Sequence, residues 1–399
     1  MTTEREVRPR KCKKRAEDQY VEEMIRSYQA SIPSYVIYDG IPFPGSLLTK
    51  RIADIKNFRI RSDDVIICGY PRSGNHWMKE IVTLLYADDV ITMKETQHIS
   101  ERIPLLELSV DMNQCIQTYM DNYFRSCGPF RPLLSKMATK FGIISHVKAS
   151  SDTLVDPLAE LEHRSSPRLM HTHLTHRMLP EGAKQGRCKI IYLIRNGKDV
   201  AVSFYEMHKM YPPFGYYSGE WKQFFHTYLS GKVCYGSWFN HVKDWYSHRE
   251  TTNVLFVKYE DMIEDLYREV MRVAQFLSKD VTADNIRDVA DKCTFKRMQE
   301  NPMATYDGLH ESIDTKKTSF LRRGKVGDWK SRLTVEQNEM FDDLFTKVFR
   351  DTDPQIRFQL NVTGQGSIYR YVFLRQDKDR LPDVYSDRFY PLYEGASVV

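Results

Sequence analysis

The fold of this chain is decided by residues 65–77, which read VIICGYPRSGNHW. Val65–Cys68 is a short apolar run, rich in β-branched residues, of the kind that forms a buried strand. A tight polar loop follows it, and from Trp77 to Leu85 apolar residues recur at helical spacing. The stretch therefore predicts a strand, a loop and a helix in direct succession.

The same order of elements returns twice further along the chain. Lys189–Ile194 predicts a second buried strand, followed by a turn at 195–197 and a helix over Lys198–His208. Val254–Tyr259 predicts a third strand, which leads into a helix over Ile263–Ser278. Strands that alternate with helices indicate an α/β fold, in which helices flank a central parallel sheet. Ligands of such sheets bind beyond the carboxyl ends of the strands, so the residues after each strand are the first site candidates.

Composition favours one catalytic domain with additions at both ends. The 399 residues carry a formal charge of +5, and 41% of them are hydrophobic, which is enough for a sizeable core. Residues 8–15 hold six positive charges and no negative ones, so the rest of the chain sums to −1. We predict a basic, disordered arm over 1–34 with one helical stretch near Tyr20–Tyr28, a single domain over 35–355 and a C-terminal extension over 356–399.

The charge distribution also bears on partners. Because the body is nearly neutral, nothing in it indicates nucleic acid binding, and the basic run is typical of a solvated arm. A nuclear-localisation or membrane-surface role is the alternative for that run. No apolar stretch approaches the roughly 20 residues of a membrane span, and the first thirty residues lack the apolar segment of a signal peptide. Seven scattered cysteines without a C-x-x-C pair are typical of reduced thiols, so we predict a cytoplasmic protein with no membrane partner.

The loop after the first strand has the features of an anion site. Small residues and the cation of Arg72 lie between a strand and a helix, where backbone N–H groups suit phosphate oxygens. The loop lacks the Walker spacing and has no Ser or Thr at the Mg²⁺ position, which disfavours a nucleotide kinase. Taken alone, it could also be an ordinary turn with an incidental arginine.

Three stretches together resemble the cytosolic sulfotransferase family. Residues 70–77 (YPRSGNHW) are similar to the family's Y-P-K-S-G-T-T-W loop, and residues 195–203 (RNGKDVAVS) to its R-N-x-K-D-x-x-x-S element. Residues 320–330 (FLRRGKVGDWK) are similar to its F-M-R-K-G-x-x-G-D-W-K element. The resemblance covers roughly residues 38 to 350 and implies a P-loop-like sulfotransferase fold. It also implies transfer of a sulfuryl group from 3′-phosphoadenosine 5′-phosphosulfate (PAPS) to a hydroxyl of a small acceptor.

The resemblance implies a binding site for PAPS as cosubstrate. PAPS carries two phosphate groups, so it needs two cationic pockets, and the planar fork of arginine suits phosphate oxygens. In the family, the Arg and Ser of the second element hold the 3′-phosphate, and two aromatic residues, here Trp77 and Phe295, enclose the adenine. The binding residues that the resemblance implies are Arg72, Ser73, Gly74, Asn75, His76, Trp77, Arg195, Ser203, Tyr259, Cys293, Thr294, Phe295, Met298, Phe320, Leu321, Arg322, Arg323 and Gly324.

A histidine is expected as the general base. The stretch MHTHL at residues 170–174 resembles the family's K-T-H-L segment, which implies that His173 takes the proton of the acceptor. His171 and His176 are close competitors. The reaction would be an in-line displacement, with His173 and Arg72 as catalytic residues and no metal required.

The sequence departs from the family pattern at several of these positions. Arg72 stands where the family has lysine, Asn75 and His76 where it has threonines, and His171 where it has the lysine before the catalytic histidine. Arginine keeps the charge but does not readily give up a proton, so we expect transfer to be retained, at a reduced rate. The alternative function is a catalytically impaired regulatory protein that binds PAPS or its desulfated product PAP.

Two further segments concern the acceptor and the quaternary structure. An insertion around residues 111–155 carries aromatic residues that either line an acceptor pocket for an alcohol, a phenol or a sterol-like molecule, or form a small core of their own. Lys330, Thr334, Val335 and Glu339 fit the family's K-x-x-x-T-V-x-x-x-E dimer segment, which implies a modest homodimer. Thr334 could equally serve as the N-cap of the following helix, and both roles are compatible.

Overall fold

The computed structural model describes residues 7–32, 35–44, 49–87, 97–107, 157–305 and 318–360. The predicted insertion around 111–155 and most of the predicted C-terminal extension lie outside these ranges. The strands are β1 (Val36–Tyr38), β2 (Ile41–Phe43), β3 (Val65–Gly69), β4 (Leu169–Thr172), β5 (Lys189–Ile194) and β6 (Val254–Lys258). The helices are α1 (Val7–Ser31), α2 (Thr49–Asn57), α3 (Asn75–Leu85), α4 (Ile99–Arg102), α8 (Pro157–His163), η2 (His176–Met178), α9 (Glu181–Lys184), α10 (Gly197–Met210), η3 (Pro212–Phe214), α11 (Trp221–Leu229), α12 (Trp238–Ser247), α13 (Tyr259–Glu264), α14 (Leu266–Phe276), α15 (Ala283–Lys292), α16 (Phe295–Glu300), η4 (Asp328–Ser331) and α17 (Val335–Val348).

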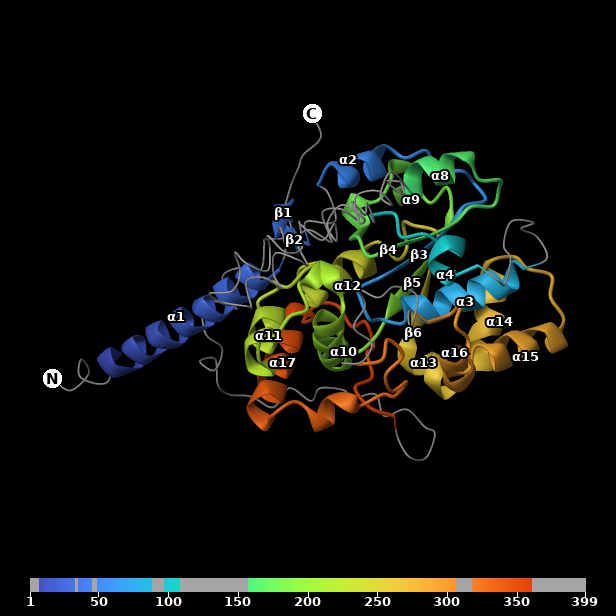
Figure 1. The fold of residues 1–399 in the computed structure, drawn as a ribbon. Coiled ribbons are helices and arrows are strands. Elements are labelled where there is room, and N and C mark those ends of the chain that lie inside the picture. The colour runs from blue at the N-terminus through green and yellow to red at the C-terminus, as the bar shows by residue number, and fades with distance from the viewer. Residues whose placement is uncertain are drawn as a thin grey trace, which may run out of the picture.

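A four-stranded parallel sheet forms the centre of the protein, with the strand order β4-β3-β5-β6. Val65 of β3 lies opposite Leu169 of β4 on one side and Lys189 of β5 on the other. β1 and β2 form a separate antiparallel hairpin. The three predicted strands are all present, and the predicted α/β fold is confirmed (Figure 1). β4, which carries His171, is an additional strand that we did not predict.

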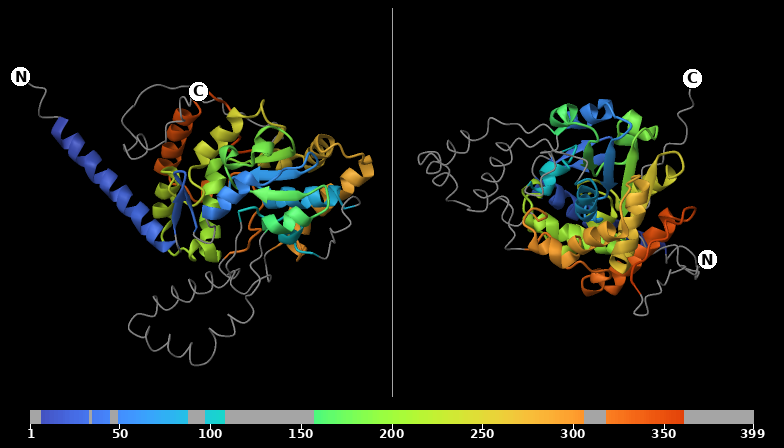
Figure 2. Two further views of the ribbon diagram at one scale, coloured as in Figure 1. Left: turned by 90° about the horizontal axis from the view of Figure 1, so that it is seen from above. Right: turned by 90° about the vertical axis from the view of Figure 1, so that its right-hand side faces the viewer.

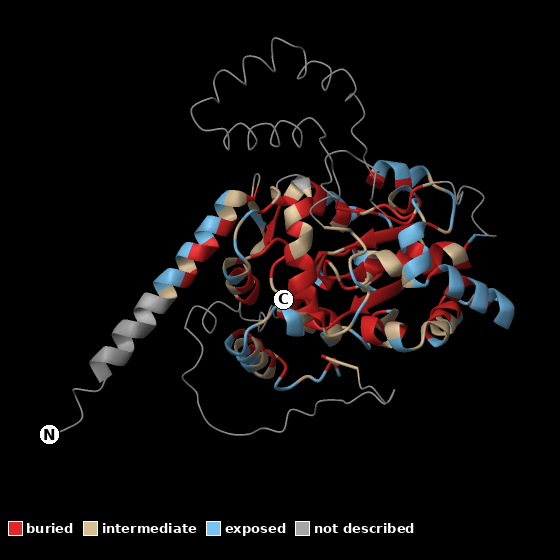
Figure 3. Ribbon diagram, turned by 60° about the horizontal axis from the view of Figure 1, so that its bottom comes forward, coloured by how far each residue is buried: buried red, intermediate tan, exposed pale blue. Residues whose placement is uncertain are grey.

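Each face of the sheet is covered by helices, as Figure 2 shows. Alternate residues of a strand point to opposite faces, so the buried strands supply two separate cores. Ile67, Ile191 and Val257 pack with α3, α14 and α15 on one face. Ile66 and Tyr192 pack with α10, α12 and α17 on the other. β3, β4 and β5 are accordingly buried on both sides, whereas β6 at the edge of the sheet is mostly half-buried (Figure 3).

The helices after the first and second predicted strands agree with the prediction. The helix after the third predicted strand does not. α3 and α10 cover the expected residues, with α10 extended slightly at both ends. The single helix predicted over Ile263–Ser278 is wrong, because α13 ends at Glu264 and α14 begins at Leu266. Asp265 between them has extended backbone (φ −150), and its side chain accepts a hydrogen bond from the Arg268 N–H. Asp is a good N-cap residue and a poor interior helix residue, which explains the break.

The N-terminal segment differs from the predicted disordered arm. Val7–Ser31 form α1, which lies against α11 (Figure 1). Val21, Ile25, Tyr28 and Ile32 recur on one side of the helix and are buried in the core. Lys and Arg are strong helix formers, so a helix anchored by these residues continues through the basic run. No helix in the described ranges is long and apolar enough to cross a membrane.

Candidate active site

The loop between β3 and α3 is held in a strained, closed conformation at the carboxyl end of the sheet. Arg72 and Gly74 have positive φ values of 72 and 105, and a Cβ at position 74 would lie 3.0 Å from the ring of Tyr259. The Asn75 amide donates to the carbonyls of Gly69 (3.3 Å) and Tyr70 (3.0 Å), which closes the loop. The N–H groups of the first turn of α3 are therefore presented at this edge, where an anion can bind.

Arg72 joins the three stretches that resemble the sulfotransferases. Its Nε donates to the hydroxyl of Ser203 on α10 (2.9 Å), and its Nη2 donates to the carbonyl of Phe320 (2.9 Å). The guanidinium also lies over the Phe320 ring, 4.7 Å from the centroid. Three segments far apart in the sequence thus meet at one arginine.

Arg195 lies at the end of β5 and is nearly buried. Its guanidinium stacks over the ring of Tyr259 at 4.1 Å and donates to the backbone carbonyls of Arg72 (3.2 Å) and Lys325 (3.3 Å). Its Nε has no hydrogen-bond partner within the described part of the chain. The Ser73 hydroxyl in the neighbouring loop is also buried and has no hydrogen-bond partner within the described part of the chain. Buried donors of this kind are costly unless a ligand satisfies them, so both fit an anionic ligand.

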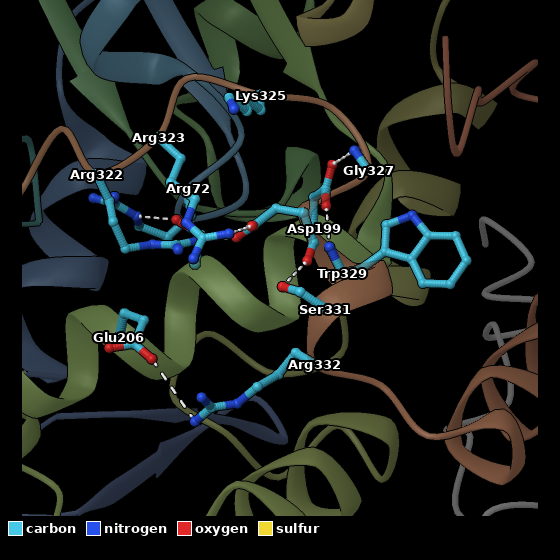
Figure 4. A network of polar contacts seen from close by, with 12 residues as sticks. Arg72, Asp199, Glu206, Arg322, Arg323, Lys325, Gly327, Trp329, Ser331 and Arg332 are labelled. Carbon is cyan, nitrogen blue, oxygen red and sulfur yellow. Dashed lines mark hydrogen bonds and ion pairs between the residues drawn. The ribbon is translucent and has the colours of Figure 1, made fainter. Parts of the chain in front are cut away.

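The segment after residue 320 is fixed by two carboxylates (Figure 4). Asp199 of α10 accepts hydrogen bonds from the backbone N–H of Gly327 (2.8 Å) and of Trp329 (2.9 Å). Asp328 forms ion pairs with both Arg322 and Arg323. The arginines are therefore held in place by a buried acid.

Aromatic residues complete the surroundings of the arginines. Trp77 donates from its indole N–H to the carbonyl of Cys293 (2.7 Å), and its ring meets Tyr259 edge-on at 5.5 Å. Phe295 packs so closely on Gly324 that a Cβ there would lie 2.4 Å from its ring, which explains why glycine (φ 58) stands at this position.

The other predicted binding residues contact their own segments. The Thr294 hydroxyl donates to the carbonyl of Asp291 (2.9 Å) just before α16, and the Met298 side chain is buried. Leu321 accepts from Gln299 through its carbonyl (2.8 Å). For Cys293 and Leu321, the backbone rather than the side chain makes these contacts.

His173 lies just beyond the end of β4, next to the loop that follows β3. Its Nδ1 bonds to the carbonyl of Gly69 (2.7 Å), and because a carbonyl can only accept, Nδ1 carries the proton and Nε2 the lone pair. Its backbone N–H donates to Glu107 (2.7 Å), and its carbonyl accepts from His241 (3.0 Å). The ring orientation and the tautomer are therefore both fixed.

Burial and neighbouring cations keep this histidine neutral. The pKa of His173 is lowered to about 4, mainly by burial and also by the charges of Lys79 and Arg72, against the opposing effect of the Gly69 bond. Burial likewise lowers the pKa of His171, whose ring lies 4.5 Å from that of His173. A neutral imidazole at physiological pH is in the form that a general base requires.

The competing histidines have other contacts. His176 bonds to the Thr252 hydroxyl (2.9 Å) and stacks on His248 (3.8 Å). His76 bonds to the carbonyl of Ala304 and packs against Phe320, at 4.8 Å between rings. Of His76, His171 and His176, only His171 has a ring nitrogen, Nε2, that is buried without a hydrogen-bond partner in the described ranges.

Two residues of the site were not predicted. Glu107 accepts from the Thr172 hydroxyl and from the His173 N–H, both at 2.7 Å, and burial raises its pKa to about 7. Nothing in the sequence around residue 107 marks it, because its role depends on the pairing of Leu105 with β4. Lys79 is buried on α3, and its position inside the apolar stretch 77–85 is a signal that could have been used.

No group of three His, Cys, Asp or Glu side chains in the described ranges is arranged to hold a metal ion. The fold and the site together place arginines and backbone N–H groups, which suit an anionic ligand, at the carboxyl edge of a parallel sheet. The chain belongs to the sulfotransferase family, since the family model described as the sulfotransferase domain matches residues 62–353. The resemblance of the sequence motifs to this family, and the predicted class of enzyme, are thereby confirmed.

Individual relatives cover most of the chain. Dog sulfotransferase 1B1 is 34% identical over 311 residues, which are 77% of this chain and 90% of the relative. Mouse sulfotransferase 1A1 is 33% identical over 328 residues, which are 80% of this chain and 97% of the relative. The crystal structure of mouse sulfotransferase SULT7A1 complexed with PAP is 28% identical, with a TM-score of 0.58, and covers 80% of this chain and 96% of its own. A retinol dehydratase structure shares the fold, with a TM-score of 0.68 at 24% identity, over 84% of this chain and 95% of its own.

Proposed function

We propose that this protein transfers a sulfuryl group from PAPS to the hydroxyl of a small acceptor. One observation carries the proposal: the anion-binding loop with Arg72, the arginine pocket around Arg195 and the lone pair of His173 meet at the carboxyl ends of β3, β5 and β4. A donor with phosphates at both ends and a hydroxyl to be deprotonated need this combination. The PAP bound to the mouse SULT7A1 structure supports the same ligand here.

The two phosphate regions of PAPS would be held by different elements. We assign the 5′-phosphosulfate to the loop of Arg72 and Ser73 and to the first N–H groups of α3. The 3′-phosphate is assigned to Arg195 and Ser203, together with the segment 322–324. Trp77 and Phe295 supply the apolar walls for the adenine. The Ser73 hydroxyl and Arg195 Nε are buried and have no hydrogen-bond partner among the described residues, which supports this arrangement, because phosphate oxygens would satisfy both donors.

His173 is assigned the role of general base. As the acceptor oxygen bonds to sulfur and the bond from sulfur to the phosphate oxygen breaks, the hydroxyl proton passes to Nε2 of His173. Nε2 is the available atom because Nδ1 is held by the Gly69 carbonyl. Arg72 carries positive charge beside the leaving phosphate, and PAP departs with the electron pair of the broken bond.

The acceptor is assigned to the class of small hydroxyl compounds: alcohols, phenols and sterol-like molecules. Tyr235 lies 5.3 Å from the His173 ring and gives the acceptor side an aromatic surface. The protein is further proposed to form a homodimer in the cytoplasm. The exposed Lys330, Thr334, Val335 and Glu339 support the dimer.

Radiolabelled PAPS offered with a panel of phenols, sterols and alcohols tests this function. We expect label to appear in at least one acceptor, and PAP to inhibit the transfer. Binding of PAP without transfer to any member of the panel would instead support the regulatory alternative. A chain that binds neither PAP nor PAPS would contradict both.

A further inference from the structure

Lys79 is a buried cation without a counter-ion in the described part of the chain. Lys79 is 3% exposed, and no hydrogen bond or ion pair joins its Nζ to another residue in those ranges. Burial lowers the pKa of Lys79 to about 7, helped by the charge of Arg102 and opposed by that of Glu80. A buried amine in this state is costly unless a ligand compensates it.

The nearby carboxylates are already engaged. Glu80, the next residue on α3, pairs with Arg102 at 2.8 Å, and both side chains are buried. Glu107 accepts from Thr172 and from the His173 N–H, as described above. Lys79 therefore gains no direct partner from either acid, and the missing negative charge must come from elsewhere.

His171 is a second unsatisfied polar group on the same side of the sheet. It pairs in register with Ile67, whose side chain packs under α3, so the His171 ring also lies on the face that α3 covers. His171 is 7% exposed, and its Nε2 has no hydrogen-bond partner within the described ranges. The charge of Lys79 lowers the pKa of His171 and of His173, which places all three groups within electrostatic reach of one another.

The position of Lys79 on α3 can be compared with the place where the sulfuryl group would lie in the proposed reaction. It lies one turn after His76, which belongs to the first turn of α3 directly behind the anion-binding loop. His173 lies within electrostatic reach of both Arg72 and Lys79. In the proposed reaction, the sulfuryl group must lie between the loop of Arg72 and Nε2 of His173. The Arg72 guanidinium is bonded to Ser203 and to the carbonyl of Phe320, so it is already engaged in this structure.

We propose that Nζ of Lys79 and Nε2 of His171 bind the oxygens of the transferring sulfuryl group, with Lys79 supplying the positive charge. This inference rests on the proposed function and names the groups that recognise the sulfuryl moiety itself. It explains why, within the described ranges, Lys79 and His171 are both buried and His171 Nε2 has no hydrogen-bond partner. Negative charge on the sulfuryl oxygens would satisfy both donors and hold sulfur opposite the acceptor.

The test compares PAPS with PAP, which differ by the sulfuryl group. In Lys79→Met, we expect the Kd for PAPS to rise about tenfold or more and the Kd for PAP to stay within about twofold of the wild type, since a charge-assisted contact is lost only for PAPS. We expect kcat to fall by about 10- to 100-fold as well. His171→Gln should also raise the Kd for PAPS relative to the Kd for PAP, by a smaller factor than Lys79→Met.

Lys189→Met is the matched control. Lys189 is the first residue of β5, at the end of the strand away from the site, and it bonds to Ser278 (2.8 Å). It should leave both affinities unchanged. If Lys79→Met lowers the melting temperature so far that binding cannot be measured, Lys79→Gln, which keeps a polar head group, carries the same comparison. An unchanged ratio of PAPS to PAP affinity in the Lys79 variant, or an equal loss for both ligands, would overturn the proposal. A wild-type chain that binds neither ligand would instead contradict the proposed function.

Discussion

At the scale of single residues, the reactive side chains are held mainly by backbone carbonyls. His173 bonds to Gly69, and Arg195 bonds to the carbonyls of Arg72 and Lys325. Backbone atoms at the ends of buried strands have little freedom, so side chains bonded to them are preorganised before any ligand binds. Small substitutions here should therefore change ligand binding more than they change folding.

Arg195→Met removes the guanidinium from the proposed 3′-phosphate pocket. We expect the Kd for PAP to rise about 10- to 100-fold, because charged hydrogen bonds of this kind contribute about 1.5–3 kcal/mol. Isothermal titration calorimetry measures this directly. Arg297→Met, which replaces an exposed arginine on α16, is the control and should bind PAP normally. Equal affinities for the two variants would contradict the assignment.

The pH dependence of the reaction reports the state of His173. Its pKa is lowered from 6.5 to about 4 in the folded protein, so the base stays neutral as the pH falls through 6.5 and is protonated only near pH 4. We expect kcat/KM for PAPS, which reports the free enzyme, to show no loss on the acid side until the pH falls below about 5. Burial is the largest cause of this lowered pKa, the charges of Lys79 and Arg72 lower it as well, and the bond to the Gly69 carbonyl opposes them. If kcat/KM of the wild type fell below pH 6.5, and this fall were absent in His173→Asn, the pKa of His173 would not be lowered as described.

Much of the site could be predicted at this scale, and some of it could not. The motifs predicted that Arg72, Ser203 and Phe320 belong to one site, and the structure joins them directly. The tautomer of His173 and the contact with Glu107 depend on the register between β3 and β4 and on the pairing of Leu105 with His171. Such pairings are tertiary and leave no local pattern in the sequence.

At the scale of elements, the start of α17 bears on the quaternary structure. Thr334 accepts a hydrogen bond from the N–H of Gln337, and the Gln337 side chain accepts from the Thr334 N–H, which forms a capping box. The N-cap role of Thr334 is therefore confirmed. Val335, the next residue, is 77% exposed, which is unusual for a large apolar side chain and supports the proposed dimer contact.

Substitutions at these two positions separate capping from association. We expect Val335→Asp to shift the protein from dimer to monomer in sedimentation velocity, because it places a charge in a small apolar contact. Thr334→Ala should lower the free energy of unfolding by about 1 kcal/mol through loss of the cap. A Val335→Asp protein that sediments like the wild type would remove the support for this segment as the interface.

The elements themselves were predicted where the pattern was local. The helices after β3 and β5 followed from apolar spacing, whereas the break at Asp265 did not, because the apolar period continues on both sides of it. β4 is four residues long and contains His171 and Thr172, so it lacks the continuous apolar run of the other central strands. Its strand conformation comes from pairing with β3.

At the scale of the whole molecule, α1 is part of the folded body. Tyr28 is fully buried, bonds to His208 (2.8 Å) and accepts from the Cys234 N–H (3.1 Å), so α1 is tied to α10 and to the segment that follows α11. The sequence prediction of a disordered arm gave too much weight to the charge of residues 8–15. The apolar positions that anchor the helix begin at Val21, beyond that run.

Two deletions test this role of α1. Removing residues 1–34 also removes Val21, Ile25 and Tyr28 from the core, and we expect the melting temperature to fall by about 10 °C or more, at about 1.5–3 kcal/mol for each buried side chain. Removing only residues 1–17 leaves these contacts in place and should change the melting temperature by no more than about 2 °C. Equal melting temperatures for the longer deletion and the full chain would contradict the packing of α1.

The central claim is sulfuryl transfer from PAPS with His173 as the base. The most direct measurement is single-turnover transfer from radiolabelled PAPS to the best acceptor of the panel, by the wild type and by His173→Asn, with PAP affinity measured on the same preparations. We expect the wild type to transfer label, and His173→Asn to be at least about a hundredfold slower while binding PAP within about twofold of the wild type. A His173→Asn protein that transfers at the wild-type rate, or a wild type that binds PAP and transfers to no acceptor, would contradict the claim.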